Sequence, residues 1–226
     1  MEVARAWTED GGLRLPQEVL AALEGHADFG SVFEWEAEPE AKLRFDSLPG
    51  ETRNTDLAVY AKDRHGPYLL AVEAKADEPF ASTVAETLAA ALERKLLNPR
   101  SNGLARVEHL ATTILGARAS GDPEVGALRY QLLTATAGAL SEAERKGLRR
   151  VLLLIHEFKT SKTDDENHKR NASDLNRFLQ RISHNTGIRH AEGALLGPFT
   201  VPGHVAVQLY IAKVARNLRA SMHYEH

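Results

Sequence analysis

Glu73 and Lys75 end the segment LLAVEAK, and an acid and a lysine at this spacing could support metal-dependent phosphodiester chemistry. If the segment is a strand, alternate residues share a face, so both side chains project beside Leu69 and Ala71. A buried charge costs several kcal/mol unless it is paired or bound to a metal. Two charges on so apolar a strand therefore require a partner.

Asp56 is the partner that the sequence offers. It lies in RNTDLAVYA, just before an apolar run, and a second apolar run begins at Tyr68. The charged, glycine-bearing segment between the runs predicts a β-hairpin, and antiparallel pairing would bring Asp56 toward Glu73. A divalent cation between the two carboxylates would relieve their repulsion and act as a Lewis acid, with Lys75 beside it. The alternative is a salt-bridge cluster of the three residues that closes a sheet edge.

The Glu-x-Lys spacing alone does not select this pair, because it occurs at four other places: Glu40/Lys42, Glu93/Lys95, Glu144/Lys146 and Glu157/Lys159. The first pair follows a polar run that is typical of a solvated edge or loop. The second and third fall in predicted helices, where residues two apart do not face each other, and Ser141 with Glu144 forms a capping-box pattern. The fourth ends a strand, but no acid precedes it on a hairpin.

The surrounding segments predict the elements that would position these residues. A short helix is expected between Pro16 and Gly25. The segment SVFEWEAE is expected to form a strand with one solvent-exposed face. Thr83 and Glu86 form a capping box ahead of a strong helix. Its apolar residues recur at helical spacing: Val84, Leu88, Ala91, Leu92 and Leu96.

The second half of the chain continues this alternation of strands and helices. Two helices are expected next, the second bent or interrupted near Gly138. The strand RVLLLIHEF, which is continuously apolar in its middle, follows them. In the strand RVLLLIHEF, His156 is expected to be a hydrogen-bonded core histidine. A helix with four inward residues (Leu175, Phe178, Leu179 and Ile182) and a last strand, HVAVQLYIAKV, complete the pattern. We expect an α/β fold with a mixed central sheet flanked by helices.

Composition narrows the chemistry. The chain of 226 residues is expected to form a single domain, 1–226, with a core at about 16–160 and a C-terminal helix and strand extension at 161–226. It contains no cysteine, which excludes disulfides, thiolate metal sites and cysteine nucleophiles. The start of the chain lacks a signal-peptide pattern, and no apolar run is long enough to span a membrane. We expect a soluble, cytoplasmic protein without a membrane partner.

Charge is distributed unevenly along the chain. Residues 1–80 hold 17 acidic and 8 basic residues, which leaves 14 of the 31 acidic and 20 of the 28 basic residues for the remainder. The acidic part suits divalent cations and the basic part suits phosphates, although two solvated faces explain the same distribution. Eight of these 20 basic residues form two groups: Arg145, Lys146, Arg149 and Arg150, and Lys169, Arg170, Arg177 and Arg181.

The order Asp56 in NTD, then Glu73 and Lys75 in VEAK, then a helix resembles the motif of the PD-(D/E)XK, or restriction-endonuclease-like, nuclease superfamily. Thr55 stands where the name-giving motif has proline, a common departure. VEAKADEPF and ALRYQLLTATAGAL also resemble an uncharacterised bacterial branch of that superfamily. The resemblance covers about residues 50–160.

The resemblance implies a restriction-endonuclease-like core that binds Mg²⁺ or Mn²⁺ through Asp56, Glu73 and the backbone carbonyl of Ala74, with Lys75 as the catalytic lysine. Many members place a further acid on the first helix, and Glu18, Glu24 and Glu34 are the candidates here.

Gln131 in RYQLL is similar to a glutamine that several branches carry on a later helix. It also lies on the apolar stripe of its own predicted helix, where a buried amide needs partners. It could orient Lys75, contact substrate or make a simple core hydrogen bond.

We therefore expect a metal-dependent nuclease that hydrolyses nucleic acid, and DNA is the expected substrate. The alternative is a nuclease-fold protein that no longer cleaves and binds nucleic acid or regulates another protein. The sequence leaves open the sequence preference, endo or exo cleavage, one or two metals, the biological pathway, and whether the chain forms a homodimer.

Overall fold

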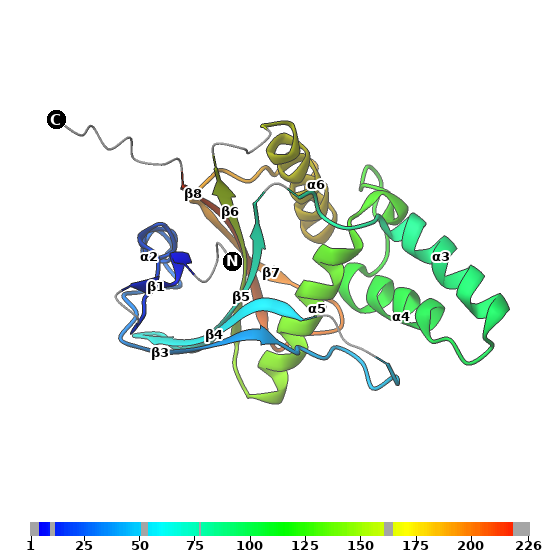
Figure 1. Cartoon of the computed structure of the whole chain (residues 1–226), viewed down its shortest axis with the longest axis horizontal. Coiled ribbons are helices and arrows are strands. Elements are labelled where there is room, and N and C mark those ends of the chain that lie inside the picture. Colours follow the sequence, from blue (N-terminus) through cyan, green and yellow to red (C-terminus); the bar gives the residue numbers. More distant parts are fainter. Residues whose placement is uncertain (1–4, 10–11, 51–53, 77, 161–164, 219–226) are drawn as a thin grey trace.

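The computed structural model describes residues 5–9, 12–50, 54–76, 78–160 and 165–218 (Figure 1). A six-stranded mixed sheet in the order β3-β4-β5-β6-β8-β7 forms its centre. The strands are β3 (Glu34–Ala41), β4 (Thr55–Asp63), β5 (Gly66–Lys75), β6 (Arg150–Lys159), β7 (Leu195–Thr200) and β8 (Gln208–Asn217). Strands β5, β6 and β8 run parallel, and the other neighbours pair antiparallel.

Helices cover both faces of this sheet, which confirms the expected α/β class (Figure 1). Helix α2 (Gln17–Glu24) lies on one face, beside the two-residue strands β1 (Thr8–Glu9) and β2 (Gly12–Leu13). Helices α5 (Tyr130–Arg145) and α6 (Asp165–Ser183) lie on the other. Beyond α5 are α3 (Val84–Leu97), α4 (Gly103–Leu110) and two short turns, the π-helix η1 (Ala111–Leu115) and the 3₁₀-helix η2 (Val125–Ala127). No described helix is both long and apolar enough to cross a membrane.

The predicted hairpin is present as β4 and β5, with Leu57 opposite Val72 and Asp63 opposite Gly66. Alternation along β5 divides the apolar residues between two cores. Leu69 and Ala71 face α5 and α6, whereas the alternate residues Tyr68, Leu70 and Val72 face α2. Because β6 is central and apolar from Val151 to Ile155, it supplies side chains to both cores. The face that carries Glu73 is therefore the face covered by α5 and α6.

Helix α5 runs without a break from Tyr130 to Arg145, so it is not interrupted at Gly138. A side chain at that position would lie 2.6 Å from the carbonyl oxygen of Leu43, so glycine allows a loop to cross the helix closely. The capping box expected at Ser141 is also absent, because Ser141 lies inside the helix. Glu144 instead pairs with His204 at 2.9 Å.

Helix α3 has the predicted capping box, but its leucines are not buried. Leu88, Leu92 and Leu96 are 45%, 48% and 71% exposed, and Val84 and Ala91 are the buried residues of this helix. The helical spacing was therefore predicted correctly, but it does not mark a buried face in this helix.

The C-terminal part of the chain is built into the sheet. Strand β8 lies between β6 and β7, and β7 was not predicted from the sequence. Its segment contains Gly197 and Pro198, and the pairing with β8 shifts register between Leu196 and Phe199. Such an interrupted edge strand carries a weak alternation signal.

Arg150 and Asp63 form a buried ion pair at the end of the sheet farthest from Lys75. Two guanidinium nitrogens of Arg150 donate to the carboxylate of Asp63 at 2.7 and 3.1 Å. The same nitrogens donate to the carbonyls of Asp28 and Gly66, and the guanidinium lies against the rings of Phe29 and Tyr68. Burial would raise the pKa of Asp63, but the hydrogen bonds from Arg150 lower it below its usual value.

His156 is a hydrogen-bonded core histidine, as expected. Trp7 Nε1 donates to its Nδ1 at 3.2 Å, and its Nε2 lies 3.0 Å from Glu18. Because indole can only donate, Nδ1 accepts and the proton of the neutral ring is on Nε2. Burial lowers the pKa of His156, and the bond to Glu18 opposes this only in part. Burial would raise the pKa of Glu18, but the bonds from His156 and Arg216 lower it to about 2.

We predict that acid destabilises the fold in two stages through this network. Below the ordinary histidine pKa of about 6.5 the unfolded chain binds a proton that folded His156 resists, so the free energy of unfolding falls as pH falls. Between pH 4.5 and about 2 the stabilising charge of Glu18 is lost as well. Urea unfolding from pH 8 to pH 3 measures this, and Glu18→Gln should reduce the slope below pH 4.5. An equal slope in the variant would contradict the assignment.

Candidate active site

Glu73 is buried, with 1% of its surface exposed, and two neutral side chains orient its carboxylate. Gln131 Nε2 donates to Oε2 at 2.5 Å, and the Thr55 hydroxyl donates to Oε1 at 3.3 Å. Gln131 in turn accepts a hydrogen bond from the Ala81 amide at 3.2 Å. Of the roles left open for Gln131, the contact made in the structure is therefore with Glu73.

Asp56, on the neighbouring strand β4, contacts the residue that follows Glu73. Its Oδ2 accepts the backbone N–H of Ala74 at 2.7 Å, just beyond the last ladder pair, Leu57 with Val72. The hairpin thus places the Asp56 carboxylate against the backbone of Ala74, the residue that follows Glu73.

Lys75 is also buried, with 5% of its surface exposed. Its ammonium lies 3.6 Å from the Glu78 carboxylate and 5.6 Å from the centre of the Phe80 ring. Asn171 of α6 holds this segment, because its side chain accepts from the Phe80 amide and donates to the Glu78 carbonyl. The lysine is therefore enclosed between the end of β5, residues 78–80 and α6.

Glu157, which the sequence argument discounted, lies beside the site. It is fully buried and is the sheet neighbour of Lys75 across the β5–β6 pairing. Its Oε2 lies 2.9 Å from both Lys213 Nζ on β8 and His168 Nδ1 on α6. Charged residues thus extend over the carboxyl ends of three parallel strands, the usual position of ligand sites in open α/β sheets. Residue spacing could not reveal this, because Lys75 and Glu157 are far apart in the chain.

The three acids proposed from the first helix and its surroundings lie elsewhere. Glu18 bonds to His156 and Arg216, and the parity of His156 on β6 places it on the α2 face. Glu24 accepts a hydrogen bond from Ser31, and Glu34 pairs with Lys62 at the distant end of β3. These three acids therefore make their contacts with residues outside the candidate site.

Of the three residues expected to hold a cation (Asp56, Glu73 and Ala74), Glu73 lines a small cavity. This cavity of about 10 Å³ adjoins the carboxylate, which is close to the space that one water-sized group needs. It is lined by Leu43, Asn54, Thr55, Glu73, Thr134, Ala135 and Gly138. Among the described residues no cluster of three or more His, Asp or Glu side chains could hold a metal. Two carboxylates and a carbonyl, with water, are nevertheless a donor set that Mg²⁺ commonly uses.

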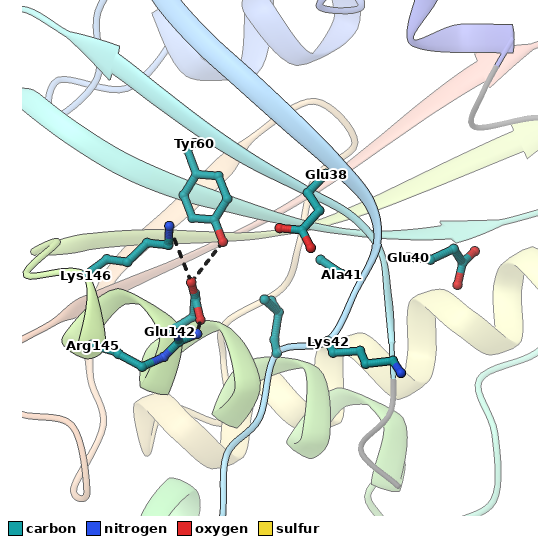
Figure 2. Close-up of a pocket in the computed structure, with 9 residues that line it drawn as sticks. Glu38, Glu40, Ala41, Lys42, Tyr60, Glu142, Arg145 and Lys146 are labelled. Carbon is teal, nitrogen blue, oxygen red and sulfur yellow. Dashed lines mark hydrogen bonds and ion pairs between the residues drawn. The ribbon is translucent and has the colours of Figure 1, made fainter.

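A second polar pocket lies at the other end of α5 (Figure 2). Buried Glu142 accepts the Tyr60 hydroxyl at 2.9 Å and pairs with Arg145 and Lys146. The pocket is lined by Glu38, Glu40, Ala41, Lys42, Leu43, Tyr60, Glu142, Arg145 and Lys146. Its acids and bases neutralise one another, and it does not include Glu73 or Lys75. We regard it as a structural contact between α5 and the β3–β4 edge.

The fold and site define an α/β protein with buried acids, a lysine and a glutamine gathered at the carboxyl ends of its strands. Residues 1–218 match the family model described as a domain of unknown function (DUF6946), and the chain belongs to this family. No curated protein matches the chain, and no solved structure does. Because the family description names no activity, the function must be inferred from the residues of the site.

Proposed function

We propose that this protein is a nuclease of the PD-(D/E)XK type that uses Mg²⁺ or Mn²⁺ to hydrolyse nucleic acid. DNA is the proposed substrate. The observation that carries the proposal is the buried Glu73, which Gln131 and Thr55 orient on the strand that also carries Lys75. A fold that needed only packing would favour an apolar residue here, because burying a carboxylate costs free energy. A catalytic demand explains why the acid is present.

Each side chain has a role that its contacts support. Gln131 fixes the direction of the Glu73 carboxylate, and Asp56 is fixed by the Ala74 amide. A divalent cation held by Asp56, Glu73 and the Ala74 carbonyl would supply Lewis acidity and lower the pKa of a bound water. Lys75 would place its positive charge beside the phosphate as negative charge develops there. Low exposure strengthens these electrostatic effects, because little water competes.

The second candidate is a protein that keeps the fold and binds nucleic acid without cleaving it. The Glu78 carboxylate lies 3.6 Å from the Lys75 ammonium, a contact that would occupy a catalytic lysine. This pair favours the binding protein only if Glu78 stays in place when substrate is present. Glu78 is exposed, and turning toward solvent would break its contacts with the Lys75 ammonium and the Ala76 amide.

We predict that Lys75→Met lowers cleavage at least about 100-fold, because it removes the charge beside the phosphate but keeps the apolar stem. Single-stranded and duplex DNA and RNA are incubated with the protein in Mg²⁺, Mn²⁺ or chelator. Lys159→Met is the matched control, since Lys159 ends β6 and pairs with Glu192 near the surface. The proposal is supported if chelator abolishes cleavage by the wild-type protein and if the Lys159→Met control still cleaves. Wild-type rates from Lys75→Met would refute the role of this lysine, and no cleavage under any condition favours the binding protein.

A further inference from the structure

The outward face of α6 borders a shallow groove whose lining charges are all positive. The groove has a volume of about 470 Å³ and is lined by Lys169, Ala172, Ser173, Asn176, Arg177, Gln180 and Arg189. All seven lining residues are described, and none of them is acidic. A groove with three bases, a hydroxyl and two amides is suited to a polyanion.

Helical spacing aligns these donors along the groove. Lys169, Ser173 and Arg177 follow one another at intervals of four residues, and the rise of 1.5 Å per residue separates each from the next by about 6 Å along the axis. Asn176 Oδ1 accepts the His190 amide at 2.8 Å, so its NH₂ group remains available as a donor. Arg189 is anchored by two backbone carbonyls, each 2.7 Å from Nη1.

The opposite face of the same helix contacts the candidate active site. Asn171 binds the backbone of residues 78–80, which enclose Lys75, and His168 pairs with Glu157. The groove and the site are thus separated by the thickness of one helix. A ligand bound along the groove would therefore lie on the far side of α6 from residues 78–80 and Glu157.

We propose that this groove binds the sugar–phosphate backbone of the nucleic acid, and this inference rests on the proposed function. Lysine and arginine would contact phosphates, while Ser173, Asn176 and Gln180 would donate to phosphate or sugar oxygens. A membrane surface is the poorer match, because a helix that lies on a membrane exposes an apolar face. The apolar face of α6, with Leu175, Phe178 and Leu179, is buried in the core.

The test measures binding separately from cleavage. Fluorescence anisotropy with labelled single-stranded and duplex DNA is recorded in chelator over a series of salt concentrations. The triple variant Lys169→Gln, Arg177→Gln and Arg189→Gln removes three charges from the groove. The matched control removes three charges from exposed positions outside the two basic groups, through Lys42→Gln, Arg64→Gln and Arg100→Gln.

We expect the groove variant to bind at least about tenfold more weakly at low salt, with a salt slope shallower by about 2 to 3 for three lost phosphate contacts. The control should match wild type. Because Arg189 also holds its own loop, Lys169→Gln alone is measured as well and should reduce the slope by about 0.7 to 0.9.

The outcomes separate the two proposals. Equal slopes for the groove and control variants would overturn the groove, and wild-type cleavage in the same preparation would leave the nuclease proposal intact. If the wild-type protein cleaves nothing but the groove variant binds more weakly than the control, the groove proposal stands and the nuclease proposal is rejected. A wild-type protein that binds no DNA at low salt would overturn the groove.

Discussion

Glu73→Gln should slow cleavage at least about 100-fold without lowering stability. The substitution keeps the size of the side chain but removes the charge that would hold a cation, and with it the interaction that stabilises the developing charge. The free energy of unfolding should not fall, because a buried charge is removed while the new carbonyl oxygen can accept the Gln131 hydrogen bond. Initial cleavage rates in Mg²⁺ and urea unfolding at pH 7 measure the two effects.

Glu142→Gln is the matched control for this prediction. Glu142 is as buried as Glu73 and lies on the same side of the sheet, where the Tyr60 hydroxyl donates to it. It is absent from the candidate site, so its neutralisation should leave the cleavage rate unchanged. Equal losses of activity from both substitutions would mean that the effect of Glu73→Gln comes from general disruption of the fold.

Arg150→Met should lower the free energy of unfolding by about 3 to 5 kcal/mol, the cost of leaving one member of a buried ion pair alone. Asp63 is 2% exposed and loses two hydrogen bonds from the guanidinium, while the Asp28 and Gly66 carbonyls lose theirs. The loss should shrink in acid, where Asp63 can take up a proton instead of remaining charged. Urea unfolding at pH 7 and pH 4 measures both parts.

The neighbouring Arg149 provides the control for this second prediction. It is exposed, so Arg149→Met should change the free energy of unfolding by no more than about 0.5 kcal/mol. The double variant Arg150→Met with Asp63→Asn should recover part of the loss, because it removes the stranded charge. A double variant no more stable than Arg150→Met would show that Arg150 acts through its packing on Phe29 and Tyr68.

The hairpin and its charged end were predictable because local rules determine them. Alternation places Glu73 and Lys75 on the face of Leu69 and Ala71, and the turn between the runs fixes which residues of β4 lie opposite β5. The amide on the apolar stripe of α5 also indicated a buried partner, which is Glu73. These inferences needed only the spacing of residues within one segment or one hairpin.

The features that were missed depend on contacts between distant segments. Glu157 joins the site because a crossover places β6 beside β5, and no local pattern records that neighbour. The leucines of α3 have the spacing of a buried face, but α5 and α4 lie between that helix and the sheet. Arg150 and Arg181, which belong to the two basic groups expected to suit phosphates, are buried and paired with Asp63 and Asp122. Burial is decided by the packing of the whole fold, which charge alone does not reveal.

The most direct test of the central claim is a crystal structure of the protein grown with Mn²⁺, with anomalous scattering used to locate the metal. We predict an anomalous peak that contacts the carboxylates of Asp56 and Glu73 and the carbonyl oxygen of Ala74, and that disappears in Glu73→Gln. An absence of any peak at these residues in wild-type crystals saturated with Mn²⁺ would contradict the account.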